Sequence, residues 1–187
     1  MNKTTEQEII KGCQKGDPEA QETLYKMLAP KLYAVCITYL KNKEDAADVL
    51  QEAFIKIFTK IDMYKKNGSI EAWARKITIN TIIDFIRKRK STTEFIEAID
   101  PGEVEISSQL PGIIEQLEAK ELQEIIQQLP EGARVAFLMH AVEGYSHEEI
   151  AKELGISIGT SKSQVARARK LLQKMIKEKW NARQRKI

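Results

Sequence analysis

The stretch SHEEIAKELGISIGTSKSQVARARKLL, residues 146–172, contains two predicted helices that are separated by a short turn. Ser146, followed one turn later by Glu149, forms a capping box, which predicts that the first helix begins here. Gly155 supplies the turn, and Ser157 can cap the second helix, which is rich in lysine and arginine. Together these features predict a helix-turn-helix, whose second helix enters the major groove of DNA.

The second helix of this pair presents groups that suit DNA. Free amides at its beginning suit a phosphate, and the planar fork of Arg167 matches the O6 and N7 acceptors of guanine. The predicted DNA-binding residues here are Ser157, Thr160, Lys162, Ser163, Arg167, Arg169 and Lys170. The competing interpretation is an ordinary solvated amphipathic helix, which does not explain why the capping box, the glycine turn and the basic helix occur together.

Helix signals also recur upstream of this stretch, whereas strand signals are scarce. An apolar face through Ile9, Ile10 and Cys13 predicts a helix that stops at Gly16. Further predicted boundaries are an N-cap at Asp17 with Pro18 in the first turn, a new helix beginning at Pro30, an N-cap at Asn42, a loop over 62–69 and a helix ending in the basic run 87–90. The chain is therefore predicted to be all-α.

Aromatic and basic side chains occur together in the segment 65–90, a composition that suits unpaired DNA. Bases stack on aromatic rings while lysine and arginine follow the backbone, and the amide of Asn80 can read a base edge. For Trp73 and Ile77 the sequence favours a position in the hydrophobic core instead. For Asn80 and the loop from Tyr64 to Ser69, a structural and a functional role are both open.

A polar, mostly acidic stripe lies on the helix that follows the cap at Asn42, and it consists of Asp45, Asp48, Gln51 and Glu52. Most charged stripes are simply solvated faces. The surrounding residues 1–90 carry a net positive charge, however, and an acidic stripe among them would repel DNA. A protein-docking surface is therefore the second interpretation. The residues alone leave both interpretations open.

The net charge of +3 conceals an uneven distribution. Residues 1–90 carry 17 basic and 12 acidic groups, residues 91–120 carry one and seven, and residues 121–187 carry 12 and eight. Two basic lobes therefore flank an acidic connector, and basic lobes attract polyanions such as nucleic acid. Serine, proline and glycine interrupt the helix formers over 91–112, which predicts a linker between two helical domains.

Several classes of site and location are excluded by what the sequence lacks. Cys13 and Cys36 have no CxxC partner and are predicted to be buried, and His140 and His147 are interpreted as a chance pair, so no metal or other cofactor is expected. The sequence offers no carboxylate–metal cluster or nucleophile constellation that would predict an enzyme. No apolar run reaches the ~20 residues of a membrane span, and the polar stretch 1–10 is unlike a signal peptide. A cytoplasmic protein without membrane insertion is therefore expected.

Three segments together resemble the sigma-70 superfamily, and specifically its small extracytoplasmic function (ECF) sigma factors. DAADVLQEAFIKIF at 45–58 is similar to the polymerase-clamp-binding segment of that family. IEAWARKITINTIIDFIRKRK at 70–90 resembles its promoter-melting, −10-reading helix. LPEGARVAFLMHAVEGYSHEEIAKELGISIGTSKSQVARARKLL at 129–172 resembles its −35-reading domain. The three segments occur in the family's order and extend over nearly the whole chain.

This resemblance implies a fold and a function. The fold would be two helical domains, a sigma-2-like bundle over 1–91 and a sigma-4-like helix-turn-helix domain over 113–187, joined by the acidic linker 92–112. The protein would be a sigma factor that binds RNA polymerase core, recognises −35 and −10 promoter elements and promotes DNA melting at transcription initiation. It would catalyse nothing by itself and need no cofactor.

The resemblance also implies partners and residue roles. The clamp of the polymerase β′ subunit would bind Asp45, Asp48, Gln51 and Glu52, and the second domain would approach the β flap. Single-stranded −10 DNA would be held by Tyr64, Lys65, Ser69, Asn80, Asp84 and Arg87. Double-stranded −35 DNA would be contacted by the DNA-binding residues already named between 157 and 170. An anti-sigma protein, often membrane-bound in this family, would hold the factor inactive.

Three positions depart from the commonest pattern of the family. Ser161 replaces a valine that packs inward, so it would loosen the helix pair or donate to a backbone carbonyl one turn earlier. Gln164 replaces an arginine, which puts one expected phosphate contact in doubt. Ile70 replaces an aromatic residue, which leaves the pocket around it undefined.

Two other functions remain as alternatives. A free-standing helix-turn-helix regulator would bind duplex DNA without polymerase, usually as a dimer on a palindrome, but it would leave the stripe at 45–52 and the segment 64–90 unused. An enzyme acting on nucleic acid would need the catalytic constellation that the sequence lacks.

Overall fold

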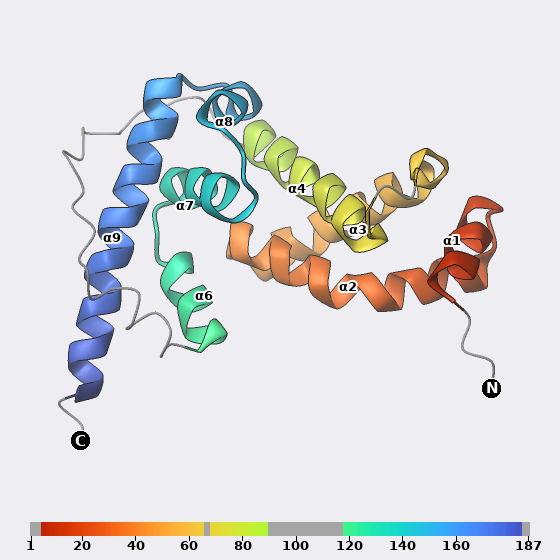
Figure 1. Cartoon of the computed structure of the whole chain (residues 1–187), viewed down its shortest axis with the longest axis horizontal. Helices are drawn as coiled ribbons and strands as arrows, with labels where there is room; N and C mark the ends of the chain where they lie inside the picture. The colour runs from red at the N-terminus through yellow and green to blue at the C-terminus, as the bar shows by residue number, and fades with distance from the viewer. Residues whose placement is uncertain (1–4, 66–67, 90–117, 185–187) are drawn as a thin grey trace. The chain divides into compact units, whose positions relative to one another are not determined.

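The computed structural model describes residues 5–65, 68–89 and 118–184. Within these ranges every regular element is a helix, as the sequence predicts (Figure 1). The chain divides into two compact units, Met1–Ile86 and Arg87–Ile187. The predicted linker 92–112 lies outside the described residues. None of the helices in the described ranges combines the length and the apolar character required to cross a lipid bilayer.

The first unit contains α1 (Glu6–Gln14), α2 (Pro18–Leu40), α3 (Lys43–Thr59), the 3-10 turn η1 (Ile61–Met63) and α4 (Ile70–Arg89), whose last turn passes the boundary of the unit. Two of these helices begin where the sequence predicts. The Asp17 carboxylate accepts a hydrogen bond from the N–H of Glu19 at 3.0 Å, and the Asn42 side chain accepts one from the N–H of Glu44 at 2.7 Å. Both predicted N-caps are therefore confirmed.

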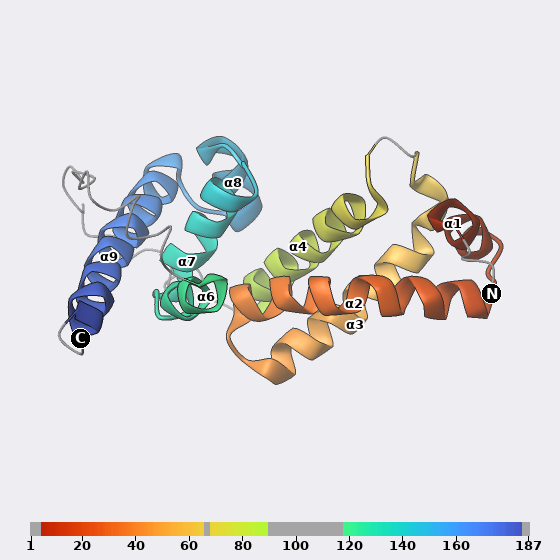
Figure 2. The same cartoon turned by 60° about the horizontal axis from the view of Figure 1, so that its bottom comes forward.

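The helix boundary predicted at Pro30 is wrong, because α2 continues through this residue to Leu40. A proline inside a helix lacks the N–H that would bond to the carbonyl four residues earlier. This loss is offset by one apolar face that runs along both halves of α2, with Leu24, Leu28, Leu32, Val35, Cys36 and Tyr39 all buried. α2 packs against α3, which crosses it obliquely in Figure 2, so tertiary contacts keep the helix continuous.

The core of the first unit also takes in α3, which buries Ala46, Val49, Leu50, Ala53, Phe54 and Ile57. α1 is tied to η1 by the side-chain amide of Gln14, which donates to the carbonyl of Ile61 at 3.3 Å. Cys13 and Cys36 are buried free thiols, as predicted. Burial raises the pKa of Cys36 to about 12, so this thiol stays protonated and unreactive.

The buried side of α4 differs from the one predicted, which contained Trp73 and Ile77. Trp73 and Ile77 are only partly buried, whereas their neighbours Ala74 and Thr78 lie in the core. Apolar and β-branched residues occur on almost every side of α4, so periodicity alone does not fix which side is buried. The buried hydroxyls of Thr78 and Thr81 donate to the carbonyls of Ala74 and Ile77 at 2.9 Å and 2.8 Å, so both polar groups are satisfied inside the core.

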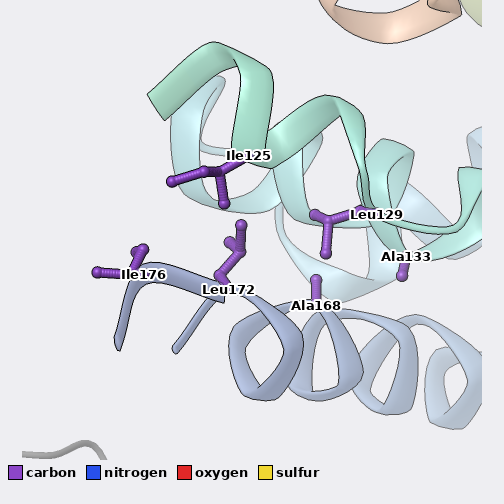
Figure 3. Packing of buried hydrophobic residues seen from close by; sticks show 6 residues of the cluster. All are labelled: Ile125, Leu129, Ala133, Ala168, Leu172 and Ile176. Atoms are coloured by element: carbon purple, nitrogen blue, oxygen red, sulfur yellow. The ribbon is translucent and has the colours of Figure 1, made fainter. Parts of the chain in front are cut away.

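The second unit contains α6 (Ala119–Gln127), α7 (Glu131–Phe137), the π-helical turn η3 (Leu138–Val142), α8 (His147–Leu154) and α9 (Ile158–Gln184). α6 is the first described element after the gap, because residues 90–117 lie outside the described residues. Figure 3 shows the apolar cluster of this unit, which consists of Ile125, Leu129, Ala133, Ala168, Leu172 and Ile176. Ala133 and Ala168 present only methyl groups, so α7 and α9 pack closely at this point.

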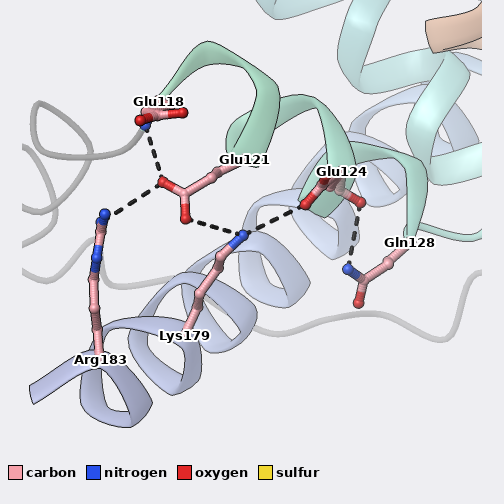
Figure 4. Close-up of polar contacts among 6 residues, drawn as sticks. All are labelled: Glu118, Glu121, Glu124, Gln128, Lys179 and Arg183. Carbon is pink, nitrogen blue, oxygen red and sulfur yellow. Dashed lines mark hydrogen bonds and ion pairs between the residues drawn. The ribbon is translucent and has the colours of Figure 1, made fainter. Parts of the chain in front are cut away.

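Ion pairs fasten α6 to the C-terminal half of α9 (Figure 4). The ammonium of Lys179 lies 3.4 Å from the Glu121 carboxylate and 3.7 Å from that of Glu124. The guanidinium of Arg183 lies 3.6 Å from Glu121. The N–H of Glu118 donates to the Glu121 carboxylate at 3.1 Å, and this bond, assisted by Lys179 and Arg183, lowers the pKa of Glu121. α6 is thus held on α9 by charge as well as by apolar packing.

Arg134 on α7 is buried, with 1% of its surface exposed. Its guanidinium donates to the carbonyl of Leu129 at 2.9 Å, which satisfies a backbone group at the turn between α6 and α7. Burial lowers the pKa of Arg134 while the nearby Glu131 opposes this change, and an arginine stays charged in either case. Although Arg134 is a cation in a basic domain, its position makes it a structural residue.

Candidate nucleic-acid interface

α8 and α9 form the helix-turn-helix that the sequence predicts. The Ser146 hydroxyl accepts from the N–H of Glu149 at 3.2 Å, and the Glu149 carboxylate accepts from the N–H of Ser146 at 2.8 Å, so the capping box is confirmed. Gly155 ends α8 with a φ of +67°, a left-handed conformation that residues with side chains rarely adopt. The N–H of Ile156 then bonds back to the carbonyl of Ala151 at 3.0 Å. The chain can therefore turn sharply into α9.

The beginning of α9 is organised by hydroxyl groups. The Ser157 hydroxyl accepts a hydrogen bond from the N–H of Thr160 at 2.9 Å, which confirms the predicted cap. The hydroxyls of Ser157 and Thr160 lie 2.9 Å apart, and the Ser163 hydroxyl donates to the carbonyl of Thr160 at 3.0 Å. These contacts fix the helix end whose free amides suit a phosphate.

α9 separates buried from exposed residues along its length. The buried side consists of Ser161, Gln164, Val165, Ala168, Leu172 and Ile176. The predicted DNA-binding residues Lys162, Arg169 and Lys170 are exposed, whereas Thr160, Ser163 and Arg167 are partly buried. A helix that packs on its domain through one side and presents cations on the other is suited to the phosphates and base edges of a groove.

Two of the departures from the family pattern point into the domain. The Ser161 hydroxyl lies 3.0 Å from Nδ1 of His147, at the beginning of α8, so it joins the two helices in place of the expected bond to a backbone carbonyl. Gln164 is 2% exposed. Position 164 does not face solvent in this structure. The replacement of an arginine by Gln164 therefore does not remove a phosphate contact from the exposed surface of α9.

His140 and His147, interpreted from the sequence as a chance pair, lie against each other in the fold. Their ring centroids are 4.3 Å apart and their planes differ by 22°, a stacked arrangement that joins η3 to α8. Nδ1 of His140 also lies 2.9 Å from the carbonyl of Tyr145. Within the described ranges, no group of three or more His, Cys, Asp or Glu residues is placed to hold a metal ion.

Acidification is expected to destabilise the second unit through His147. Burial lowers the pKa of His147 from its ordinary value of 6.5, and His140, Lys162 and Arg169 lower it further. The folded unit thus favours the neutral imidazole, and the unfolded chain binds more protons. The stabilisation is complete above the ordinary pKa and is lost as the pH falls through the lowered pKa.

Urea unfolding of the full chain at about pH 7.5 and about pH 5.5 measures this loss. A His147→Phe variant keeps an aromatic ring in the stack but cannot take up a proton. It should lose less stability over the same interval than the unaltered chain. An equal loss in both proteins would assign the pH dependence to other groups.

The loop before α4 is shaped by Tyr64, which is buried. Its hydroxyl donates to the carbonyl of Gly68 at 2.6 Å, and its ring centroid lies 5.6 Å from that of Trp73. Gly68 has a φ of +117°, which only glycine adopts readily. Ser69 accepts a hydrogen bond at 3.1 Å from the first turn of α4 and caps that helix, while Lys65 is exposed. Residues 66–67 of the predicted loop lie outside the described residues.

α4 presents Asn80 and Arg87 to solvent. Asp84 falls on the same side by helical spacing, and its carboxylate lies 3.6 Å from the ammonium of Lys56 on α3. Ile70, at the beginning of α4, is 1% exposed. Position 70 therefore contributes to the core.

α3 presents the acidic stripe on the side opposite its buried face. Asp48 and Gln51 are exposed, whereas Asp45 and Glu52 are partly buried. The Glu52 carboxylate lies 2.9 Å from the ammonium of Lys56, one turn further along the same helix. The structure therefore brings the four predicted residues together on one surface.

Ile55 and Lys56 are not among the predicted residues, although both lie at this surface. Ile55 is 67% exposed. Its position one turn after Gln51 is the sequence signal that places it beside the acidic stripe. An apolar side chain within a polar face suits a protein partner better than a nucleic acid backbone.

Two family models match the chain, one mainly in the first unit and one in the second. Sigma-70 region 2 matches residues 24–92, and sigma-70 region 4 matches residues 119–172. The ECF RNA polymerase sigma factor SigW of Bacillus subtilis (strain 168) is 31% identical over 186 residues, which cover 90% of this chain and 95% of that protein. The chain belongs to the ECF sigma factors of the sigma-70 family.

Other sigma factors show a similar likeness. The ECF RNA polymerase sigma-E factor of Escherichia coli (strain K12) is 29% identical over 177 residues, which cover 90% of this chain and 92% of that protein. The solved structure of the sigma factor RpoE in complex with the anti-sigma factor NepR from Bartonella quintana covers 83% of this chain and 96% of that chain, with 26% identity and a TM-score of 0.48. The region 2 match begins within α2, and the region 4 match ends within α9.

As an ECF sigma factor, the chain is a non-enzymatic subunit of RNA polymerase that acts in transcription initiation and binds DNA through its helix-turn-helix. Its architecture is that of the family, an all-helical region 2 unit followed by an all-helical region 4 unit. The alternative of a free-standing helix-turn-helix regulator does not account for the region 2 match.

Proposed function

We propose that the two helical units divide promoter recognition between them. Residues 1–91 would bind polymerase core and the −10 element, residues 113–187 would bind the −35 element, and residues 92–112 would connect them. The two family matches fall separately at 24–92 and 119–172, which supports this division. When both units are held on one polymerase they act at a high effective concentration, so each can bind DNA weakly by itself.

The polymerase-binding surface of this proposal is the exposed side of α3. Asp45, Asp48, Gln51 and Glu52 would dock on the clamp of the β′ subunit. Asp48 and Gln51 are already exposed, so they can reach a partner without a rearrangement of α3. An acidic surface on a basic unit repels DNA and favours a cationic protein surface. By family analogy, the second unit would approach the β flap.

The −10 strand is proposed to bind along the loop before α4 and the exposed side of α4. This surface consists of Tyr64, Lys65, Ser69, Asn80, Asp84 and Arg87. Lys65 and Arg87 attract phosphates, and the amide of Asn80 can pair with the edge of an unstacked base. Tyr64 and Ser69 serve this surface by holding the loop and the helix end in shape. Flipping a base out of the duplex costs roughly a few kcal/mol, which these contacts must offset.

One observation carries the proposal for the second unit: α9 is capped at its beginning and presents exposed cations outside its buried side. The proposed −35-binding residues are Ser157, Thr160, Lys162, Ser163, Arg167, Arg169 and Lys170. Among them, Arg167 is the proposed reader of a guanine, since a guanidinium can donate to O6 and N7 together. Lys162 is the proposed phosphate contact, since its ammonium is exposed and carries no directional fork.

An Arg167→Ala variant is expected to weaken −35 binding by about 1–3 kcal/mol, and only at the base pair that Arg167 contacts. A Lys162→Ala variant should weaken binding to all sequences about equally and reduce its dependence on salt, because a phosphate contact releases counterions. Fluorescence anisotropy of the polymerase–sigma complex on duplexes with each −35 base pair changed in turn distinguishes the two results.

Lys177→Ala is the matched control for these variants. Lys177 is exposed on α9 but follows the region 4 match, so its removal should leave base preference unchanged. The broader test is transcription in vitro with core polymerase across a promoter library. A chain that neither bound core nor directed transcription from promoters with matched −35 and −10 elements would end the proposal.

Family membership also supports a proposed location and a further proposed partner. Polymerase core acts on chromosomal DNA, so the working location is the cytoplasm. An anti-sigma protein that occupies the polymerase-binding surface would keep the chain inactive. Purification of the tagged full-length chain from cells, with and without excess core, would test whether such a protein competes with polymerase.

A further inference from the structure

Lys56 lies between the two proposed surfaces of the first unit. It belongs to α3, and its ammonium lies 2.9 Å from Oε1 of Glu52 on the same helix. The same ammonium lies 3.6 Å from Oδ2 of Asp84 on α4. All three side chains are partly exposed, between 30% and 43%, so partners can reach them. One cation is therefore shared by carboxylates from two helices.

The two carboxylates serve different partners in the proposed function. Glu52 belongs to the polymerase-binding stripe of α3, and Asp84 lies on the strand-binding side of α4 between Asn80 and Arg87. A carboxylate on that side repels DNA phosphates, because like charges interact unfavourably across a few ångströms. The ammonium of Lys56 offsets the charge of Asp84 and reduces this repulsion.

We propose that Lys56 is a positioning residue that couples polymerase docking to strand binding, an inference that rests on the proposed function. When Glu52 contacts a cationic surface of the polymerase, that surface repels Lys56, which then keeps Asp84 as its carboxylate partner. Docking thereby strengthens the ion pair of Lys56 with Asp84, which joins α3 to the C-terminal part of α4. The ion pair of Lys31 with Glu71 fastens the beginning of α4 to α2 and is independent of this exchange.

The arrangement predicts opposite effects when the cation is removed. In a Lys56→Met variant, Glu52 loses a competing partner within the chain, so the stripe attracts a cationic surface at least as strongly as before. Asp84 loses the cation of Lys56 as well, so the strand-binding side of α4 repels phosphates more strongly. A general loss of structure would instead weaken both interactions.

The test measures two affinities of the full-length chain, one for core polymerase and one of the polymerase–sigma complex for a single-stranded −10 oligonucleotide. Lys56→Met should bind core at least as tightly as the unaltered chain. It should bind the oligonucleotide about threefold to fivefold more weakly, the size expected of a partly exposed ion pair. The double variant Lys56→Met, Asp84→Asn should regain most of the affinity that Lys56→Met loses, because the repelling carboxylate is gone, and the cycle completed by the Asp84→Asn single variant measures the coupling of the pair.

Lys26→Met is the matched control, because it removes the same charge from the same unit. Lys26 pairs with Glu22 one turn earlier on the exposed side of α2, much as Lys56 pairs with Glu52. This variant should change neither affinity by more than about 1.5-fold. A larger effect of Lys26→Met on the oligonucleotide would mean that net charge, and not the shared cation, sets strand affinity.

The inference is overturned if Lys56→Met weakens core binding and oligonucleotide binding together. It is also overturned if Asp84→Asn does not restore strand binding to the Lys56→Met variant. An Asp48→Lys variant separates these failures from a failure of the proposed function. If Asp48→Lys leaves core binding unchanged, the polymerase-binding surface itself is misplaced. Asp48→Lys could instead weaken core binding as expected while Lys56→Met fails to combine retained core binding with weaker oligonucleotide binding. In that case the polymerase-binding surface stands and only the proposed coupling through Lys56 is wrong.

Discussion

Reversing one charge on the exposed side of α3, in an Asp48→Lys variant, is expected to weaken binding to core RNA polymerase by at least about tenfold. Asp48 is exposed and belongs to the proposed docking stripe. A lysine at this position would meet the proposed cationic surface of the clamp, and like charges that meet in an interface cost roughly several kcal/mol. Promoter-directed transcription at limiting sigma should fall with core binding. Titration of labelled core with the variant measures the change in Kd.

Glu178→Lys is the control for Asp48→Lys, because it changes the net charge by the same amount on an exposed part of α9. It should leave core binding within about twofold of the unaltered chain. Asp48 is a surface position, where a substitution typically changes stability by less than about 0.5 kcal/mol, and circular dichroism verifies that the helices are retained. Unaltered core binding by Asp48→Lys would remove the stripe from the proposed function.

Leu172→Ala is expected to lower the free energy of unfolding of the second unit by about 2–5 kcal/mol. Leu172 lies in the apolar cluster between α6 and α9 that Figure 3 shows. Its removal leaves a cavity, and the methyl groups of Ala133 and Ala168 are too short to fill it. Domains are stable by roughly 5–15 kcal/mol in total, so −35 binding should become sensitive to modest heating.

Leu171→Ala provides the matched control, because the adjacent leucine is only partly buried. The same chemical change should cost less than about half as much there, since less apolar surface returns to water. Trp73 lies in the first unit and Trp180 in the second. Urea unfolding followed by fluorescence in a Trp73→Phe background therefore reports on the second unit. Equal losses for the two leucines would contradict the burial pattern of α9.

Helix ends were largely predictable from the sequence, because they depend on residues that are close together in the chain. Asp17, Asn42, Ser146 and Ser157 each accept a hydrogen bond from the first turn of the helix that follows. Gly155 takes the left-handed conformation that a sharp turn needs. Short-range rules of this kind require no knowledge of the rest of the fold.

Helix continuity and the choice of buried side were less predictable, because they depend on which surfaces meet. Pro30 is a helix breaker by local rules, but the packing of α2 on α3 overrides it. In α4 the sequence offered several apolar stripes, and the fold buried Ala74 and Thr78 while leaving Trp73 and Ile77 partly exposed. Only tertiary contacts distinguish between such alternatives.

The candidate surfaces could be predicted by residue type, whereas the roles of single residues could not. Asp48, Asn80 and Lys162 are exposed, as a binding residue requires. Tyr64 is buried beneath its loop, and Asp84 pairs with a lysine from another helix, and neither fact follows from local patterns. Contacts between distant residues depend on the whole fold, so they became visible only in the structure.

α9 is a single helix of 27 residues, or about 40 Å at the usual rise per residue. The region 4 signature ends at Leu172, but the remaining turns supply Ile176 to the apolar cluster and Lys179 and Arg183 to the ion pairs with α6. The residues that match the family model therefore end before the residues that complete the packing of the second unit. A chimeric sigma factor that takes over this helix-turn-helix domain should therefore keep α9 at least as far as Arg183.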